Sequence, residues 1–381
     1  NKLKNKGKKM KNITKILLSL IASFAISTAS FAGELTVTGD AKASYQMGSS
    51  DSTTGAINGS KNIGITNEIT FSATGELDNG FAWKWQTELD SGAETSSGAG
   101  IDDSQIVITT DMGNIGIYVS EGSLRGAALG WDVSAFGAGS DNGNGGSMKL
   151  GNELSGWNNL QLHTPAGLLP YGTVFKVGRS FGDTGINSYK SAGGAASDTH
   201  TDQVVGSATA NWTSSEVTQY QIETTPLDGL TIKADYMDVG SVAATANRYS
   251  PEEGHISAKY AYGNLSVGVG AGWLQNAVSK SSTGSTIDFY SNESIGIGYA
   301  VNDSLSLSYT MEESTANFAG IDSQGGGNGA AGDVALEVNS LQGAYTMGGM
   351  TMALSLDDIE NAGYVTAKDQ KEILFTVALS F

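Results

Sequence analysis

Apolar and polar residues alternate along most of this chain. At its end, Ile373, Phe375, Val377, Leu379 and Phe381 fall on one face of a strand, and the residues between them fall on the other. The same alternation recurs in about sixteen segments, an even number typical of closed membrane barrels. The segments lie at 35–47, 63–77, 81–89, 104–110, 114–120, 158–163, 171–180, 217–224, 230–239, 254–262, 264–274, 286–300, 304–313, 333–346, 350–358 and 371–381.

The connections between these segments alternate between short and long. Short turns such as Asp78-Asn79-Gly80 and Gly263-Asn264 alternate with long stretches rich in Gly, Ser and Asp, at 48–61, 91–102, 121–157, 181–202, 240–253, 275–285, 314–332 and 359–369. A soluble β-sandwich or solenoid, such as a secreted adhesin, shares the strand pattern but has no reason to alternate its connections. The sequence therefore predicts an all-β fold, a transmembrane antiparallel β-barrel whose apolar faces meet lipid.

The first 32 residues have the pattern of a secretory signal peptide. A lysine-rich start is followed by the apolar run Ile16 to Ile26 and by small residues before a cut that we place after Ala32. We expect 1–32 to be removed, and 33–381 to form a single barrel domain of an exported protein.

The charge balance excludes one class of partner. Without the seven lysines before residue 16, the chain holds 14 basic and 39 acidic residues, a formal charge of −25. Nucleic acid is therefore not an expected partner, because phosphate binding needs clustered Lys and Arg. The chain has no cysteine, so we expect no disulfide and no thiolate metal site.

Several features together resemble one family, the general diffusion porins of Gram-negative outer membranes, most closely the alphaproteobacterial type. They are the signal peptide, the opening strand Gly33 to Gly39, the turn Asp111 to Asn114, the long third loop Glu121 to Trp157, and the terminal Phe381. The resemblance implies a third loop that folds into the barrel and narrows the pore, and association as a homotrimer. Phe381 resembles the signal read by the outer-membrane assembly machinery. The Pro-Glu-Phe motif of the enterobacterial members is absent from the loop, so the constriction is expected here as a loop and its residues are a hypothesis.

Strand alternation predicts which charges face the lumen. The wall candidates are Lys42, Lys84, Lys176, Lys233 and Lys259, with Asp40, Glu88 and Asp235 beside them. The loop candidates are Glu121, Arg125, Asp132 and Glu153. We expect the loop carboxylates to face Lys42 and Lys84 and, with the negative charge of the chain, to give weak cation selectivity. For each residue the alternative is a solvated side chain in a wide vestibule that has no effect on transport.

No enzyme motif or cofactor site is present in the sequence. The three histidines lie far apart, and neither a His-Glu-x-x-His pattern nor a phosphate loop occurs. The acidic pairs Asp102-Asp103, Glu312-Glu313 and Asp357-Asp358 could bind divalent cations that bridge to lipopolysaccharide, although solvated loop charges explain them as well. We therefore predict a channel for ions and small hydrophilic solutes. A substrate-selective channel and a non-conducting, structural or adhesive surface barrel are the alternatives.

Overall fold

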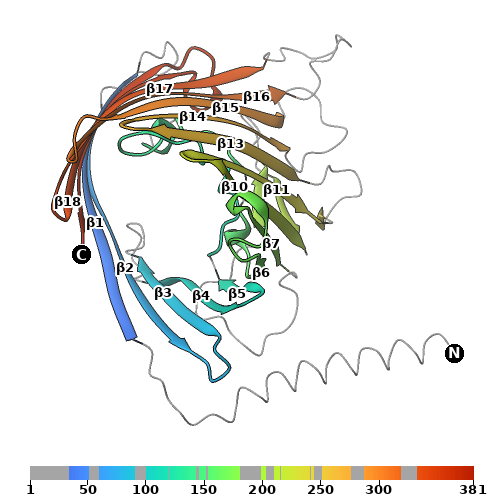
Figure 1. Ribbon diagram of the computed structural model, residues 1–381. Coiled ribbons are helices and arrows are strands. Elements are labelled where there is room, and N and C mark those ends of the chain that lie inside the picture. The colour runs from blue at the N-terminus through green and yellow to red at the C-terminus, as the bar shows by residue number, and fades with distance from the viewer. Residues whose placement is uncertain are drawn as a thin grey trace.

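Sixteen antiparallel strands close into one barrel in the computed structural model (Figure 1). The structure describes residues 34–50, 60–90, 100–119, 121–142, 146–151, 153–180, 199–202, 210–214, 216–240, 242–243, 251–275, 287–318 and 333–381. Neighbouring strands pair in chain order, and β1 pairs with β19, in a register that places Asp40 opposite Ser380, to close the ring. The predicted barrel of about sixteen strands is thus confirmed. The predicted signal peptide lies outside the described residues.

The barrel strands have the following bounds: β1 Glu34–Ser50, β2 Ser60–Glu76, β3 Ala82–Asp90, β4 Gly100–Thr110, β5 Gly113–Val119, β6 Asn159–His163, β7 Val174–Ser180, β10 Val217–Leu227, β11 Leu230–Val239, β13 Glu252–Tyr262, β14 Leu265–Gln275, β15 Ile287–Ala300, β16 Leu305–Phe318, β17 Val334–Met347, β18 Met350–Glu360 and β19 Gln370–Ser380.

Three further short strands form a separate sheet. They are β8 Thr199–Asp202, β9 Ala210–Ser214 and β12 Val242–Ala243. Residues 199–202 and 242–243 lie in connections between barrel strands, as predicted, but the short strands within these connections were not predicted. Strands of two to five residues are too short to show a periodic pattern.

Burial in the barrel is the reverse of that in a soluble protein. Large apolar side chains such as Ile65, Ile295 and Leu341 are exposed on the outer face, whereas polar side chains such as Gln219 and Thr310 are fully buried inside. Residues two apart on a strand share a face, so the register carries this inversion from strand to strand. An outer apolar face of this kind suits lipid and a polar inner face suits water.

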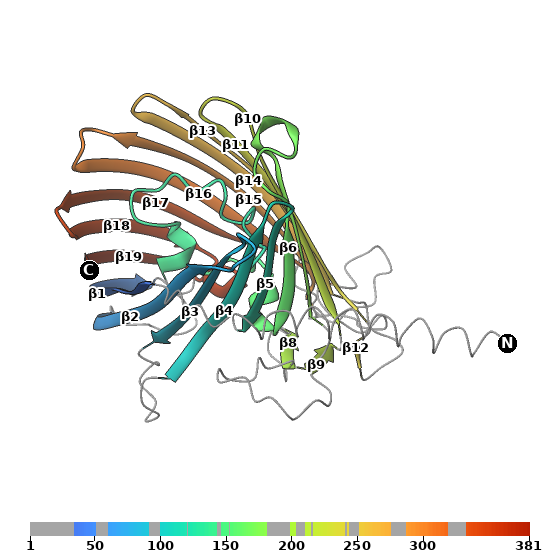
Figure 2. The ribbon, with the colours of Figure 1, turned by 60° about the horizontal axis from the view of Figure 1, so that its bottom comes forward.

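The short connections gather at one end of the barrel (Figure 2). Gly80 (φ 81°) and Gly229 (φ 76°) adopt left-handed backbone conformations that only glycine takes without strain. The connection between β6 and β7 is the longer exception at this end and includes η3 Pro170–Gly172. The described residues include no helix long and apolar enough to span a membrane.

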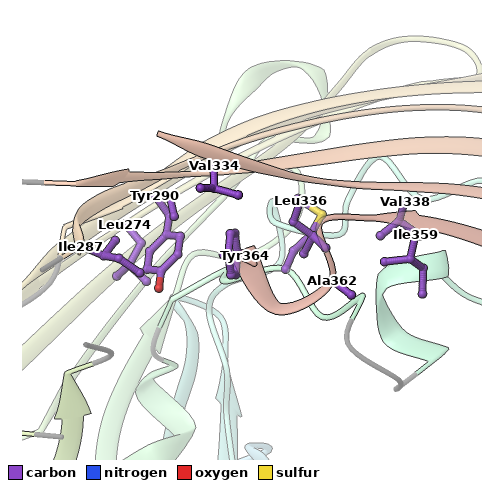
Figure 3. Close-up of a cluster of buried hydrophobic side chains, with 11 residues drawn as sticks. Leu274, Ile287, Tyr290, Val334, Leu336, Val338, Ile359, Ala362 and Tyr364 are labelled. Carbon is purple, nitrogen blue, oxygen red and sulfur yellow. The ribbon is translucent and has the colours of Figure 1, made fainter. Parts of the chain in front are cut away.

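The opposite, long-loop end contains an apolar cluster inside the wall. Tyr290, Val334 and Leu336 from the strands pack around Tyr364 of η4 (Ala362–Tyr364), in the connection between β18 and β19 (Figure 3). The rings of Tyr290 and Tyr364 are 5.1 Å apart, and the Tyr364 hydroxyl lies 2.7 Å from Ser314 Oγ. The cluster holds this connection against the inner wall of β14 to β18.

Phe381 lies beside the first strand. Its backbone exchanges two hydrogen bonds of 2.9 Å with Gly39, and 70% of the residue is exposed. The aromatic ring thus lies on the outer, apolar face of the barrel. Its role as an assembly signal stays a prediction.

Candidate functional site: the lumen and the β5–β6 segment

The connection between β5 and β6, residues 121–157, contacts the inner face of the barrel. We call it the β5–β6 segment. Its green ribbon lies within the ring of strands in Figure 1. It contains η1 Gly139–Asn142 and η2 Leu154–Gly156. Near its ends, Leu124, Leu154 and Trp157 are buried against Val217 and Met237 of β10 and β11.

Side chains of the wall accept hydrogen bonds from the backbone of this segment. Buried amides outside a helix or sheet need such partners. The Ala127 N–H donates to Asp235 Oδ2 at 2.7 Å and the Phe136 N–H donates to Gln342 Oε1 at 3.0 Å. Further contacts of this kind run from Leu124 N–H and Leu154 N–H to Gln219 Oε1, from Ala135 N–H to Ser308 Oγ and from Ser140 N–H to Glu312 Oε1. In addition, Lys149 N–H donates to the hydroxyl of Tyr364 in η4. The polar inner face therefore holds the segment against β10, β11, β16 and β17.

Glycines on β14 provide room for Trp131 of the segment. A Cβ atom at Gly268 would overlap the Trp131 carbonyl oxygen, and one at Gly270 would lie 2.6 Å from Trp131 Cδ1. Trp131 is 1% exposed, and its indole N–H donates to the Ala128 carbonyl at 3.1 Å. The glycines of β14 thus form the surface on which Trp131 of the segment packs.

The predicted charges of the segment are placed as follows. Arg125 forms an ion pair with Glu153 and donates to the Gly151 carbonyl at 2.6 Å. Lys259 Nζ lies 3.5 Å from the Asp132 carbonyl oxygen. Arg125 and Glu153 therefore neutralise each other within the segment, and Asp132 lies near a lysine of β13.

Glu121 lies among acids rather than beside a lysine. Carboxylate oxygens of Glu88, Asp103 and Glu121 lie within 4.8 Å of one another. Lys42 Nζ lies 5.8 Å from the centre of the Phe136 ring. The described contacts therefore do not include the expected pairing of Glu121 or Glu153 with Lys42 or Lys84.

The other wall lysines share the inner face with hydrogen-bonding side chains. Lys176 on β7 is opposite Gln221 of β10, and Lys233 on β11 is 3.2 Å from Glu223 Oε2. Lys84 on β3 is opposite Thr74 and Val107. All five wall lysines lie at inward positions of the register, as strand alternation predicts.

Comparison with solved structures shows the fold. No family model and no curated protein sequence matches the chain. The chain is similar to the anion-selective porin from Comamonas acidovorans, with a TM-score of 0.62 and 12% identity over 92% of this chain and 100% of that one. The chain has the fold of the bacterial porins. Two further similar structures are the Vibrio cholerae outer-membrane protein OmpT in its trimer form (TM-score 0.59, 12% identity, 92% and 100% covered) and Salmonella typhi OmpF in complex with daunomycin (TM-score 0.57, 15% identity, 91% and 98% covered).

Four residues of the barrel wall help to hold the β5–β6 segment, although the sequence analysis assigned none of them this role. The carboxylate of Asp235 accepts from Ala127 and lies 2.7 Å from His255 Nδ1, with both side chains buried. Gln219 accepts hydrogen bonds from Leu124 and Leu154 near the two ends of the segment, and Glu312 accepts one from Ser140 in its middle. The sequence shows that these residues are polar and occupy inward positions of their strands. The alternation of residues does not show which inward position a loop contacts.

Two ionisable groups of the segment have shifted pKa values. Partial desolvation inside the barrel raises the pKa of Asp141, with the nearby charge of Asp132 adding to the rise and Arg125 and Lys42 opposing it. Burial lowers the pKa of Lys149. Lys42 therefore does lie in electrostatic range of a carboxylate of the segment, although that carboxylate, Asp141, was not a sequence candidate.

The acidic pairs of the sequence do not act as units. Adjacent residues of a strand point to opposite faces. Glu312 is buried on the inner face while Glu313 is exposed outside, and Asp357 and Asp358 divide in the same way. Asp358 forms an exposed ion pair with Lys371 at 3.2 Å. The two carboxylates of such a pair cannot hold one cation, because the wall of the barrel separates them. Asp102 lies outside the described side chains, and divalent-cation binding by the chain stays a prediction.

Proposed function

We propose that this protein is a porin of a bacterial outer membrane, a water-filled channel for the passive diffusion of ions and small hydrophilic solutes. The observation that carries the proposal is the reversed burial of a closed sixteen-strand barrel, apolar outside and polar inside. A barrel of this size is too wide for its own side chains to fill. The porin fold of the similar structures supports the same conclusion.

The β5–β6 segment borders the narrowest part of this channel. Its hydrogen bonds to β10, β11, β16 and β17, and its packing on β14, support a fixed position inside the lumen. Held in this way, the segment limits the size of the solutes that pass.

Weak cation selectivity forms part of the proposal. The acids Glu88, Asp103 and Glu121 converge on one side of the lumen, and Asp132 and Asp141 lie on the segment. Carboxylates lining a pore raise the local concentration of cations. Homotrimer formation, delivery by the outer-membrane assembly machinery through Phe381, and contact with outer-membrane lipid and lipopolysaccharide belong to the same proposal.

Solute uptake tests the proposed channel. The folded protein is placed in liposomes, and swelling is recorded with sugars of increasing size. We expect rapid swelling with monosaccharides and a steep fall for larger oligosaccharides. Equal swelling of liposomes with and without folded protein would contradict diffusion through the barrel.

Reversal potentials test the selectivity. In a salt gradient we expect Glu121→Gln with Asp132→Asn to reduce the cation preference, because two lumen carboxylates are lost. Glu313→Gln with Glu337→Gln removes the same charge from the outer face and should leave the reversal potential unchanged. An equal effect of both double variants would remove Glu121 and Asp132 from the selectivity of the pore.

A further inference from the structure

The charged side chains of the inner face are sorted along the barrel axis. At the long-loop end, five inward carboxylates lie within three residues of the end of their strand. They are Glu88 on β3, Asp103 on β4, Glu253 on β13, Asp357 on β18 and Glu372 on β19. Glu121 follows β5 at the same end and lies against Glu88 and Asp103. Glu253, Asp357 and Glu372 are buried, so the acidic surface that the lumen reaches at the long-loop end is formed by Glu88, Asp103 and Glu121.

Four of the five inward wall lysines lie toward the other end, within three residues of the short-turn end of their strand: Lys84 on β3, Lys176 on β7, Lys233 on β11 and Lys259 on β13. The fifth, Lys42, lies in the middle of β1. Lys176, Lys233 and Lys259 occupy one sector of the wall, since β7, β10, β11 and β13 are consecutive strands of the barrel. The register places Lys176 in the same row as Gln221, Asp235 and His255, and it places Lys233 and Lys259 on the short-turn side of that row.

Carboxylates at the short-turn end are fewer in this lysine sector. Glu223 lies there and is held by Lys233 at 3.2 Å. Glu34, Asp40 and Glu76 lie toward the same end on β1 and β2, and the strands β3 to β6 separate them from β7. Within β7 to β13, lysines thus exceed carboxylates at the short-turn end, whereas acids dominate the long-loop end.

Two oppositely charged zones in series have a consequence for ion flow. Cations concentrate in the acidic zone and anions concentrate beside the lysines. A voltage that is positive on the long-loop side drives both kinds of ion toward the junction of the zones, where they accumulate. The opposite voltage draws both kinds away and depletes the junction. The current therefore depends on the sign of the voltage.

We propose that the channel is axially polarised, with an acidic zone at the long-loop mouth and an anion-attracting lysine zone, Lys176, Lys233 and Lys259, at the short-turn mouth, so that it rectifies ionic current. This inference rests on the proposed channel function and adds a second ion class, small anions such as carboxylates and phosphates, that the lysine zone attracts.

Current–voltage curves of single channels in symmetric KCl test the polarity. We expect currents about 1.5-fold larger when the long-loop side is positive at 0.1 M salt, where charges act over about 10 Å, and a ratio near one at 1 M, where that distance falls to about 3 Å. The orientation is read from a biotin on a Met112→Cys variant, because the chain has no other cysteine and Met112 is exposed in a short turn. Fluorescent streptavidin is added to one chamber at a time. The chamber from which it binds the membrane is the one that the short turns face.

Matched variants test whether the two charged zones cause the difference in current between opposite voltages. Lys176→Gln with Lys259→Gln removes two charges of the lysine zone and should bring the ratio of the currents at opposite voltages in 0.1 M KCl close to one. Glu88→Gln with Asp103→Asn removes two charges of the acidic zone and should have the same effect. Lys61→Gln with Lys371→Gln removes two lysines from the outer face and should leave the ratio unchanged. A symmetric current from the conducting wild-type protein, or a ratio that both lumen variants leave unchanged, would overturn the proposal. A membrane without any current would instead contradict the channel function itself.

Discussion

Asp235 links the wall to the β5–β6 segment through a single carboxylate. One oxygen accepts the Ala127 N–H and the other lies 2.7 Å from His255 Nδ1, and both side chains are buried. A buried carboxylate with two donors is costly to replace, because each donor then needs another partner. The residue thus fixes the position of the segment as well as the local stability of the barrel.

We expect Asp235→Asn to loosen the segment. The amide can accept from only one of the two donors, so the unfolding free energy in lipid vesicles should fall by about 1–3 kcal/mol, and single-channel currents should become noisier. Asp238→Asn on the outer face of the same strand is the matched control. Urea unfolding followed by tryptophan fluorescence measures the difference, and equal stability of the two variants would contradict this role.

Asp141 should give the channel a pH dependence. Because desolvation raises its pKa, this carboxylate takes up a proton at a higher pH than an ordinary Asp. As the pH falls, the part of the cation preference that Asp141 provides should therefore be lost at a higher pH than it would be for an ordinary Asp. Reversal potentials measured from pH 7 to pH 3 check this. Asp141→Asn should remove that part of the decrease, and an unchanged profile in that variant would assign the effect to another group.

Among the elements, β14 defines the path of the β5–β6 segment. Its inward glycines allow the backbone of Trp131 to approach the strand more closely than any side chain would permit. Glycine alternates at 268, 270 and 272, so one face of this part of the strand has no side chains. The sequence does not predict which residue packs on that face, because loop conformation has no period.

We expect Gly268→Val to displace the segment from β14. The added side chain overlaps the Trp131 backbone, so conductance should change by a measurable fraction and the size limit for sugars should rise. Gly64→Val on β2 is the control, since the only atom near a Cβ there is Ser44 Oγ at 3.6 Å. Conductance is read in planar bilayers, and identical values for both variants would contradict a segment seated on β14.

At the scale of the whole molecule, strand alternation and connection length were sufficient to predict the barrel. The inward positions of Lys42, Lys84, Lys176, Lys233 and Lys259 followed from the same alternation, because apolar residues in lipid leave the polar positions for the lumen. The side-chain contacts of the β5–β6 segment could not be predicted from this alternation. Arg125 pairs with Glu153 rather than with the wall, and Glu121 lies beside Glu88, because contacts across a lumen depend on loop geometry and on register between distant strands.

Conduction of ions through the lumen of the barrel is the property on which the proposed function depends. It is measured by single-channel recording of the folded protein in a planar bilayer with a salt gradient. We expect discrete conductance steps, grouped in threes, with a reversal potential of cation sign. A silent membrane, with protein shown to be folded and inserted, would contradict the channel and would move the function to the long loops.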